Sequence, residues 1–469
     1  MIDSKFYCAN TTCLPFINII TLNIKNCQFA CLSQSPCKAA TFHRSTSNCE
    51  LFDNILNQNE NMLTDVDVTS MNVISGTQFP SEPTTTSTSM TSSLSATPST
   101  TTKSSSTSTT TSSSSSSSTS AATTTIACNV FLNQTTYAVD FQPISVAVAD
   151  VNNDNKPDIV VANRNSNTVS VLLNAGSGTF NAQTTYTVGT QPYQVAVVDV
   201  NGDNKPDIIV TYSGSNTTGV LLNAGNGTFS AQIIYTAGTS PYSVAVVDVN
   251  GDNKPDIIIT NWGSSTVGVL LNAGNGTFNA QTTYAVGFNP QSVAVVDVNS
   301  DNKPDIVVAN WGANNVGILL NVGSGTFHAQ TTYSVGTRPY SVAVVDVNSD
   351  NKPDIIVANS GSNTVGVLLN AGNGTFSAQT SYPAGTFPWS VAVVDVNSDN
   401  NPDIIVANSD SNDVDVLLNA GNGTFNAQIT YTVGSSPSSV AVVDVNQDNK
   451  PDIIVAKSAS SSVAVLLHC

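Results

Sequence analysis

After Ala127 the chain alternates short apolar runs with short polar turns on a fixed period. An aspartate that ends an apolar run recurs every 49 residues without a slip. The seven aspartates are Asp150, Asp199, Asp248, Asp297, Asp346, Asp395 and Asp444. A constant period of this length is the signature of a repeat architecture.

Each copy contains four strand-like runs, such as SVAVVDV, PDIIVTY, TGVLLNA and TFSAQIIYTAG. The first and third are almost continuously apolar and rich in valine, as in strands that are covered on both faces. Turns of Gly, Asn, Ser and Pro separate them. Seven copies of four antiparallel strands predict an all-β fold, a seven-bladed β-propeller. An open solenoid is the alternative, but seven is a common closing number and the two ends fit each other.

The last copy lacks its fourth strand. It supplies strands over 439–444, 452–457 and 463–467, and then the chain ends. The missing strand is present at the other end, because 131–137 aligns with 180–186, one period later. We therefore expect the N-terminal segment to complete the last blade, which removes two open sheet edges. Alternatively, a long linker allows the strand to complete a neighbouring molecule and to build a chain of propellers.

Two cysteines fit this register. Cys469 falls in the repeat slot of Ala175, and Cys128 in the slot of Ser177. A Cys128–Cys469 disulfide would replace the missing hairpin and close a loop of about 340 residues, worth roughly 5 kcal/mol on the chain-entropy model. Two free thiols are the alternative.

Every copy carries the motif D-V-N-x-D-N-x-P-D between its first two strands. Side-chain oxygens at positions 1, 3, 5 and 9, with a backbone carbonyl at position 7, suit Ca²⁺ better than a transition metal. Position 6 is Asn in all seven copies, and Asn tolerates the left-handed backbone that such a turn requires. The alternative is an Asp/Asn-rich turn with solvated carboxylates, although three carboxylates within nine residues repel one another without a cation.

The predicted side-chain ligands are Asp150, Asn152, Asp154, Asp158, Asp199, Asn201, Asp203, Asp207, Asp248, Asn250, Asp252, Asp256, Asp297, Asn299, Asp301, Asp305, Asp346, Asn348, Asp350, Asp354, Asp395, Asn397, Asp399, Asp403, Asp444, Asn446, Asp448 and Asp452. The predicted carbonyl ligands are those of Lys156, Lys205, Lys254, Lys303, Lys352, Asn401 and Lys450.

The net charge of −18 has its origin in these loops, where 7 × 3 = 21 of the 32 acidic residues lie. Up to seven structural calcium ions would add +14 and leave −4. The acidity is thus interpreted as metal ligation, and it argues against a nucleic-acid partner.

The repeat resembles the FG-GAP (VCBS-like) family of integrin α-subunit propellers and other extracellular proteins, over residues 128–469. Besides the calcium spacing, a G-x-x-P slot matches, although blade one has Asp140 in place of the glycine before Pro143. The slot comprises Gly189–Pro192, Gly238–Pro241, Gly287–Pro290, Gly336–Pro339, Gly385–Pro388 and Gly434–Pro437. The resemblance implies structural calcium at the edge of each blade and no particular activity.

Six of the eight cysteines lie before residue 50. An even count in a short segment indicates a disulfide framework and an oxidising compartment, with reduced thiols or a zinc site as the alternative. Cys27-x3-Cys31-x5-Cys37, followed by KAATF and by Cys49-Glu50-Leu51-Phe52, resembles a PAN/apple domain over about residues 5–80. The resemblance implies Cys27–Cys49 and Cys31–Cys37, leaves Cys8 with Cys13, and implies protein or carbohydrate binding.

From Pro83 to Thr125, 35 of 43 residues are Ser or Thr. Alone, this segment should be disordered; it is interpreted as a flexible spacer or, if O-glycosylated, as a mucin-like stalk. The predicted domains are therefore 1–80, 81–126 and 127–469. We expect an extracellular protein, although no leader is visible at Met1-Ile2-Asp3-Ser4 and no stretch is apolar enough to span a bilayer.

Little in the chain predicts catalysis. The three histidines, His43, His328 and His468, stand in unrelated contexts. No Ser/His/Asp set or phosphate-binding loop is evident, and paired carboxylates occur only in the metal loops.

Aromatic residues gather on the side of the disc opposite the metal loops. They are interpreted as a platform for sugars or a protein anchor, or, for the tyrosines, as packing between blades. The candidate ligand-binding residues are Tyr193, Tyr242, Trp262, Trp311, Tyr340 and Trp389. The N-glycosylation sequons begin at Asn10, Asn133, Asn216, Asn226, Asn275, Asn373 and Asn422.

These features favour a non-enzymatic extracellular calcium-binding adhesion or matrix protein that binds glycans or proteins. The alternatives are a glycosylated structural subunit of an extracellular filament and a polysaccharide lyase or hydrolase.

Overall fold

A computed structural model describes residues 37–43, 48–53 and 130–469 of the chain. The chain divides into two units, Met1–Ser117 and Ser118–Cys469. In the first, β1 (Cys37–His43) and β2 (Asn48–Asp53) form an antiparallel hairpin. The predicted pairings among the six N-terminal cysteines, the Ser/Thr-rich segment and Asn10 lie outside the described residues and stay predictions.

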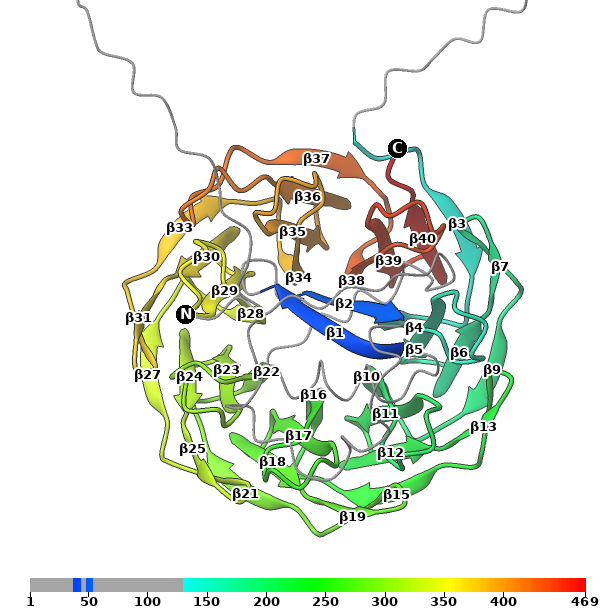
Figure 1. Cartoon of the computed structure of the whole chain (residues 1–469), viewed down its shortest axis with the longest axis horizontal. Helices are drawn as coiled ribbons and strands as arrows, with labels where there is room; N and C mark the ends of the chain where they lie inside the picture. The colour runs from blue at the N-terminus through cyan, green and yellow to red at the C-terminus, as the bar shows by residue number, and fades with distance from the viewer. Residues whose placement is uncertain (1–36, 44–47, 54–129) are drawn as a thin grey trace, which may run out of the picture. The chain divides into compact units, whose positions relative to one another are not determined.

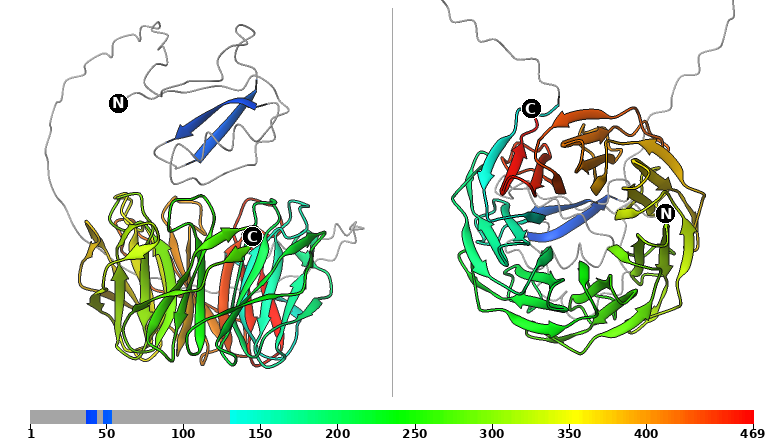
Figure 2. Two further views of the ribbon diagram at one scale, coloured as in Figure 1. Left: turned by 90° about the horizontal axis from the view of Figure 1, so that it is seen from below. Right: turned by 180° about the vertical axis from the view of Figure 1, so that it is seen from behind.

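The second unit consists of seven four-stranded antiparallel sheets with small hairpin arms (Figures 1 and 2). Each sheet starts with a strand that begins at the proline of the G-x-x-P slot, or at Pro143 in blade one. These first strands are β4 (Pro143–Ala149), β10 (Pro192–Val198), β16 (Pro241–Val247), β22 (Pro290–Val296), β28 (Pro339–Val345), β34 (Pro388–Val394) and β38 (Pro437–Val443).

The second strand of each sheet begins at position 9 of the acidic motif. These strands are β5 (Asp158–Asn163), β11 (Asp207–Tyr212), β17 (Asp256–Asn261), β23 (Asp305–Asn310), β29 (Asp354–Asn359), β35 (Asp403–Asn408) and β39 (Asp452–Lys457). All of their residues are buried. The sequence pattern predicted such burial for the first and third strands instead, and the last three residues of each first strand are only partly buried.

The third strands are β6 (Thr168–Leu172), β12 (Thr217–Leu221), β18 (Thr266–Leu270), β24 (Asn315–Leu319), β30 (Thr364–Leu368), β36 (Asp413–Leu417) and β40 (Ser462–Leu466). The outer strands are β9 (Thr184–Thr187), β15 (Ile233–Thr236), β21 (Thr282–Ala285), β27 (Thr331–Ser334), β33 (Thr380–Pro383), β37 (Ile429–Thr432) and β3 (Thr135–Ala138).

Between the third and outer strands, five blades carry a two-stranded arm. The arms are β7 (Asn174–Gly176) with β8 (Thr179–Phe180), β13 (Asn223–Gly225) with β14 (Thr228–Phe229), β19 (Asn272–Gly274) with β20 (Thr277–Phe278), β25 (Asn321–Gly323) with β26 (Thr326–Phe327), and β31 (Asn370–Gly372) with β32 (Thr375–Phe376). In blade six the arm is reduced to one bridge between Asn419 and Phe425.

The ring is closed. Neighbouring first strands contact one another all the way around the centre, including β38 of the last blade with β4 of the first (Figure 1). The core consists of seven apolar clusters, each shared by two adjacent blades. The predicted seven-bladed propeller is thus confirmed, and the open solenoid is excluded.

The N-terminal segment completes the last blade within the same chain. In that sheet the strand order is β3-β40-β39-β38, and Thr135 lies opposite Val465. Phe131 is only 6% exposed and packs its ring on Tyr431 and His468, with centroids 5.4 and 5.2 Å away. The N–H of Leu132 donates to the carbonyl of Leu467 at 2.8 Å. The predicted closing strand is confirmed.

Cys469 is disulfide-bonded, and its N–H donates to the carbonyl of Val130 at 3.1 Å. Its predicted partner, Cys128, lies outside the described residues, so the Cys128–Cys469 pairing stays a prediction. In the described part of the chain, no helix has the length and apolar character that a membrane span requires.

Candidate functional sites

The two faces of the propeller differ in chemistry. We call the side formed by the Asp-rich loops (150–158 and its six repeats) and the hairpin arms the acidic face. Loop and arm lie together there, because the Asn174 amide donates to the Pro157 carbonyl at 3.0 Å. We call the opposite side, formed by the connections before each first strand and after each second strand, the aromatic face. These connections are joined by backbone hydrogen bonds such as Trp262 N–H to the Ser240 carbonyl at 3.0 Å.

On the acidic face, the carboxylate at position 1 organises each loop. In every copy its Oδ2 accepts the N–H of position 6 at 2.7–2.8 Å, as Asp150 does from Asn155. All seven position-6 asparagines have positive φ, as expected from the sequence. Position 4 also has positive φ in every copy, although Asn, Ser or Gln occupies it in five of them. The loops therefore hold two left-handed residues each, where the sequence predicted one.

The aspartate at position 9 has a different environment. Asp158 is fully buried; its Oδ2 accepts the Val151 N–H at 3.0 Å and its Oδ1 accepts the Asn174 N–H at 2.7 Å. Burial is the main cause that raises the pKa of Asp158 to about 6, and the neighbouring Asp150 and Asp154 carboxylates raise it further against these two hydrogen bonds. All six equivalents are buried in the same way with raised pKa values.

Lysine at position 7 pairs with position 5 in the first five loops. Lys156 Nζ lies 3.0 Å from Asp154 Oδ2, and the four equivalent pairs are 3.0–3.3 Å apart. Although burial alone would raise the pKa of Asp154, hydrogen bonds from Lys156 lower it overall. Blade six has Asn401 instead, and in blade seven Lys450 donates to the Cys469 carbonyl.

The residues of each loop fit a calcium ion in their chemistry. The donors are all oxygens, which calcium prefers. The buried position-9 carboxylate has no cationic partner among the described residues, and each of its oxygens keeps a lone pair beyond its one N–H contact. As the loops stand, no three acidic, histidine or cysteine side chains of the described residues converge on one point. The residues that would hold an ion are Asp150, Asn152, Asp154 and Asp158, and Asp154 would then exchange its contact with Lys156 for one with the ion.

On the aromatic face, one repeat column closes the centre of the ring. The second residue of each first strand is Ile144, Tyr193, Tyr242, Gln291, Tyr340, Trp389 or Ser438. The hydroxyls of Tyr193 and Tyr340, from blades two and five, meet across the ring at 2.7 Å, and Gln291 Nε2 donates to the Tyr193 hydroxyl at 2.9 Å. Tyr242 stacks on Tyr193 at 4.0 Å, and Trp389 lies 4.4 Å from Tyr340. We call these five side chains the aromatic plug.

The plug corrects the sequence-based assignment of Tyr193. This side chain is 8% exposed and both of its hydroxyl contacts are internal, so it is a packing residue and not a ligand contact. Packing between adjacent blades, the other interpretation, is also incomplete, because Tyr193 reaches across the ring. Tyr242, Tyr340 and Trp389 belong to the plug as well but remain partly exposed.

A second column surrounds the plug. The residue after each second strand is Arg164, Ser213, Trp262, Trp311, Ser360, Ser409 or Ser458. Trp262 lies 5.5 Å from Tyr242 in a stacked arrangement, and both tryptophans are partly exposed. The guanidinium of Arg338 lies 5.1 Å from the Trp311 ring, and Phe288 nearby is 64% exposed. Trp262 and Trp311 are therefore placed where a ligand can reach them.

Sequence reasoning that counted only aromatic residues missed Gln291, Arg164 and Arg338. The first two occupy the tyrosine and tryptophan columns, so the repeat alignment contained the signal. Phe387 precedes its proline with φ of 57°, and its ring contacts Tyr340 and Trp389. A bulky residue in this backbone region is unusual.

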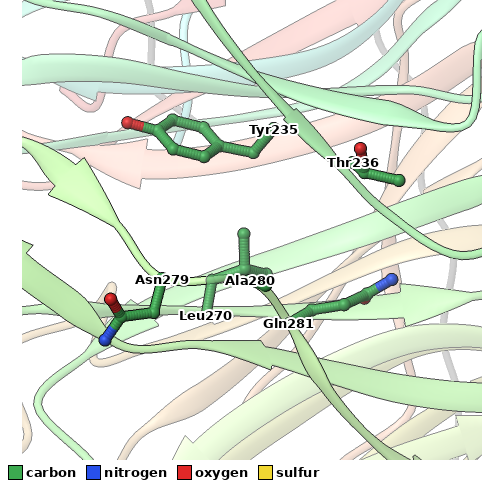
Figure 3. A pocket seen from close by; sticks show the side chains of 6 residues that line it. All are labelled: Tyr235, Thr236, Leu270, Asn279, Ala280 and Gln281. Atoms are coloured by element: carbon green, nitrogen blue, oxygen red, sulfur yellow. The ribbon is translucent and has the colours of Figure 1, made fainter.

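The remaining candidate residues, the sequon asparagines and the histidines, lie away from the acidic loops and from the aromatic plug. The six described sequon asparagines are exposed, four of them at the tips of the arms or of the reduced arm in blade six. His328 is exposed and His468 packs on Phe131; neither imidazole hydrogen-bonds to a hydroxyl or carboxylate among the described residues. A hollow of about 240 Å³ on the outer rim is lined by Tyr235, Thr236, Leu270, Asn279, Ala280 and Gln281 (Figure 3). It is smaller than the usual ligand pocket.

Comparisons with known proteins agree with this description. Six overlapping segments match the FG-GAP-like repeat: residues 150–210, 199–259, 248–308, 297–357, 346–406 and 395–455. Residues 14–75 match the PAN domain. No curated protein matches the chain.

Solved structures of other proteins share the fold at low identity. A streptogramin B lyase is 16% identical with a TM-score of 0.53 and covers 72% of this chain and 98% of its own. Virginiamycin B lyase from Staphylococcus aureus is 15% identical with a TM-score of 0.51, covering 72% and 99%. BBS1N in complex with ARL6DN is 12% identical with a TM-score of 0.54, covering 72% and 97%. At these identities the likeness shows the propeller fold alone.

Proposed function

Because this chain belongs to the FG-GAP-like repeat family, we propose that it is a non-enzymatic extracellular protein that binds a glycan or a partner protein through its aromatic face. FG-GAP-like repeats together with a PAN domain are typical of extracellular proteins of the binding or adhesion type. On this proposal, calcium stabilises the opposite, acidic face.

The observation that carries the proposal is the unequal variation of the two faces among the copies. On the acidic face, six copies repeat D-V-N-x-D-N-K-P-D, and the copy in blade six changes only the lysine, to Asn401. On the aromatic face, the column of Trp262 and Trp311 also holds arginine and serine, and the plug column holds five residue types. The uniform loops of the acidic face are expected of residues that every blade needs in order to fold. The varied columns of the aromatic face place partly exposed rings in one sector of the propeller, where a single ligand can be recognised.

Calcium would be held by the side-chain oxygens of positions 1, 3, 5 and 9 and by the position-7 carbonyl of each loop. When bound, it supplies positive charge to carboxylates that repel one another. Asp158 and its equivalents then tie that charge to the blade, because both of their oxygens also accept backbone N–H groups of the loop and the arm.

The binding proposal is tested with the double variant Trp262→Ala/Trp311→Ala in the full chain. Binding to a panel of glycans and extracellular proteins should be lost, with little change in the melting temperature. The matched control is Ile233→Ala/Ile234→Ala, which removes two exposed apolar side chains from the outer strand β15. A variant that fails to fold would show that the tryptophans are core residues, and retained binding would refute the assignment of the face.

A second candidate, a structural subunit of an extracellular filament, is favoured by one observation. The closing strand β3 contributes four ladder residues, three of them exposed, and lies just after the predicted linker. In the structure this strand closes its own ring. The same strand in a neighbouring ring would link molecules into a chain.

A further inference from the structure

We propose that the aromatic face recognises an acidic polysaccharide and that Arg164 binds its carboxylate or sulfate group. This inference rests on the proposed function, since it names the ligand class for the same face. It follows from the position of Arg164, from the lack of any anionic partner for it among the described residues, and from the polar groups around it.

Arg164 occupies the same repeat position as Trp262 and Trp311, at the edge of the aromatic plug. Its guanidinium carbon lies 5.6 Å from the centroid of the Tyr193 ring. Burial raises the pKa values of Tyr193, Tyr242 and Tyr340, and the charge of Arg164 opposes that rise at all three. The single positive charge of Arg164 thus acts on the pKa values of three tyrosines of the plug.

No described residue neutralises this charge. The side chain of Arg164 has no ion pair in the described structure, and its buried Nε has no hydrogen-bond partner. The buried Lys457 hydrogen-bonds to Gln134 and Thr136, and five loop lysines pair with aspartates. A buried donor of a charged group without a partner is costly, and an anion from outside the chain would satisfy it.

The surroundings of Arg164 favour a saccharide over an apolar peptide. Trp262 and Trp311 offer partly exposed ring faces, on which pyranose rings can stack. In the same column the partly exposed Ser458 donates to the Ser436 carbonyl at 2.9 Å, so its oxygen keeps lone pairs for a sugar hydroxyl. Ser213 and Ser360 make the same kind of contact but are buried. Two partly exposed aromatic platforms, one accessible hydroxyl and one unpaired guanidinium fit a polyhydroxylated chain that carries anions.

The position of the anion site is also consistent with the charge distribution. The 21 loop aspartates lie on the acidic face, whereas the two arginines of the propeller, Arg164 and Arg338, both lie on the aromatic face. The arginine charge therefore lies on the aromatic face, which is the face that an anionic ligand would approach.

The test is isothermal titration of the full chain, in calcium, with three oligosaccharides: an oligogalacturonate, its methyl ester and a sulfated galactan. The ester keeps the sugar rings and removes the charge. The wild type should bind at least one of the two anionic oligomers more tightly than the ester, and the one that binds identifies the anion. Arg164→Gln should weaken that binding about tenfold, as expected for a charge-assisted hydrogen bond, and leave the ester unaffected.

Arg338→Gln is the matched control, because it removes the same charge from the same face. It should change the affinity about threefold or less. If Arg164→Gln does not fold, Arg164→Lys keeps the charge but not the planar donor fork, and it should still weaken binding.

Several results would overturn the inference. The first is an equal loss of affinity in the two arginine variants, and the second is equal binding of the ester and the acid. The third is binding that survives in Arg164→Gln but disappears in EDTA, which would place the anion on calcium. An acidic peptide that binds where no saccharide does would exclude the saccharide class. Equal binding of ester and acid leaves the proposed function standing, whereas a wild type that binds no glycan or protein at all refutes both.

Discussion

Chelation of calcium should destabilise the propeller strongly, because all seven loops lose their ion together. If each loop binds with the dissociation constant of extracellular modules, about 10⁻⁴–10⁻³ M, then about 2 mM calcium stabilises the fold by about 0.7–1.8 kcal/mol per loop. For seven independent loops this amounts to about 5–13 kcal/mol. With the usual unfolding entropy per residue, a unit of about 340 residues should then melt about 7–17 °C lower without calcium.

The assay is differential scanning calorimetry in EDTA and in calcium, with magnesium as the control ion. Magnesium demands a rigid octahedral shell, so it should restore less of the melting temperature. Blade six offers a sharper test, because it lacks the Lys–Asp pair of the first five loops. Asn401→Lys should supply a competing ammonium beside Asp399 and reduce the calcium gain by up to one loop's share. A melting curve that is indifferent to EDTA would refute the calcium assignment.

The other predictions concern pH, the closing strand and the terminal cysteine. In EDTA, stability should increase as the pH falls from about 8 to 5. Burial raises the pKa of all seven position-9 aspartates above the ordinary aspartate value, to about 6 in five of them, so protonation favours the folded state. Melting temperatures that fall over this range would contradict it, and calcium should remove the increase. Phe131→Ala should lower the free energy of unfolding by about 3–5 kcal/mol. Leu132→Ala, at a side chain that is 45% exposed, should change it by less than about 1 kcal/mol. Denaturant titration compares the two variants, and equal effects would show that Phe131 does not anchor β3. Non-reducing peptide mapping should join the peptides of Cys128 and Cys469; a free Cys469 would exclude the link, and a covalent ladder under denaturing, non-reducing conditions would show exchange of the strand between molecules.

Most of the propeller could be predicted because the repeat has a constant phase. A period that never slips assigns each residue to one strand and one column, and the same phase showed that 131–137 is the missing strand. The left-handed turn at Asn155 was predictable from residue chemistry, since few other residues adopt it. The second left-handed residue of each loop was not, because Ser300 or Gln447 has no such local preference and follows the geometry of the loop.

The centre of the aromatic face could not be predicted in the same way. A column tells which residues are equivalent, but the distance across a ring depends on its radius and on the size of every residue in the column. Because the column mixes large rings with Gln291 and Ser438, the alignment did not show that the hydroxyls of Tyr193 and Tyr340 meet. Asp415 is a similar case: it is buried in a slot that other blades fill with glycine, serine or alanine, and Asn408 and Thr430 donate to it.

The closing strand also determines how the molecule bears mechanical load. The segment that leads to the N-terminal unit enters the propeller at Val130, beside the terminal Cys469. A pull along that segment first meets the hydrogen bonds of Val130 and Leu132 and the buried ring of Phe131, before it reaches the β3 ladder. If Cys128 is linked to Cys469, the force bypasses β3 and passes into β40, the third strand of the last blade. The propeller would then stay closed under tension, because the disulfide would join the incoming N-terminal segment covalently to the last blade.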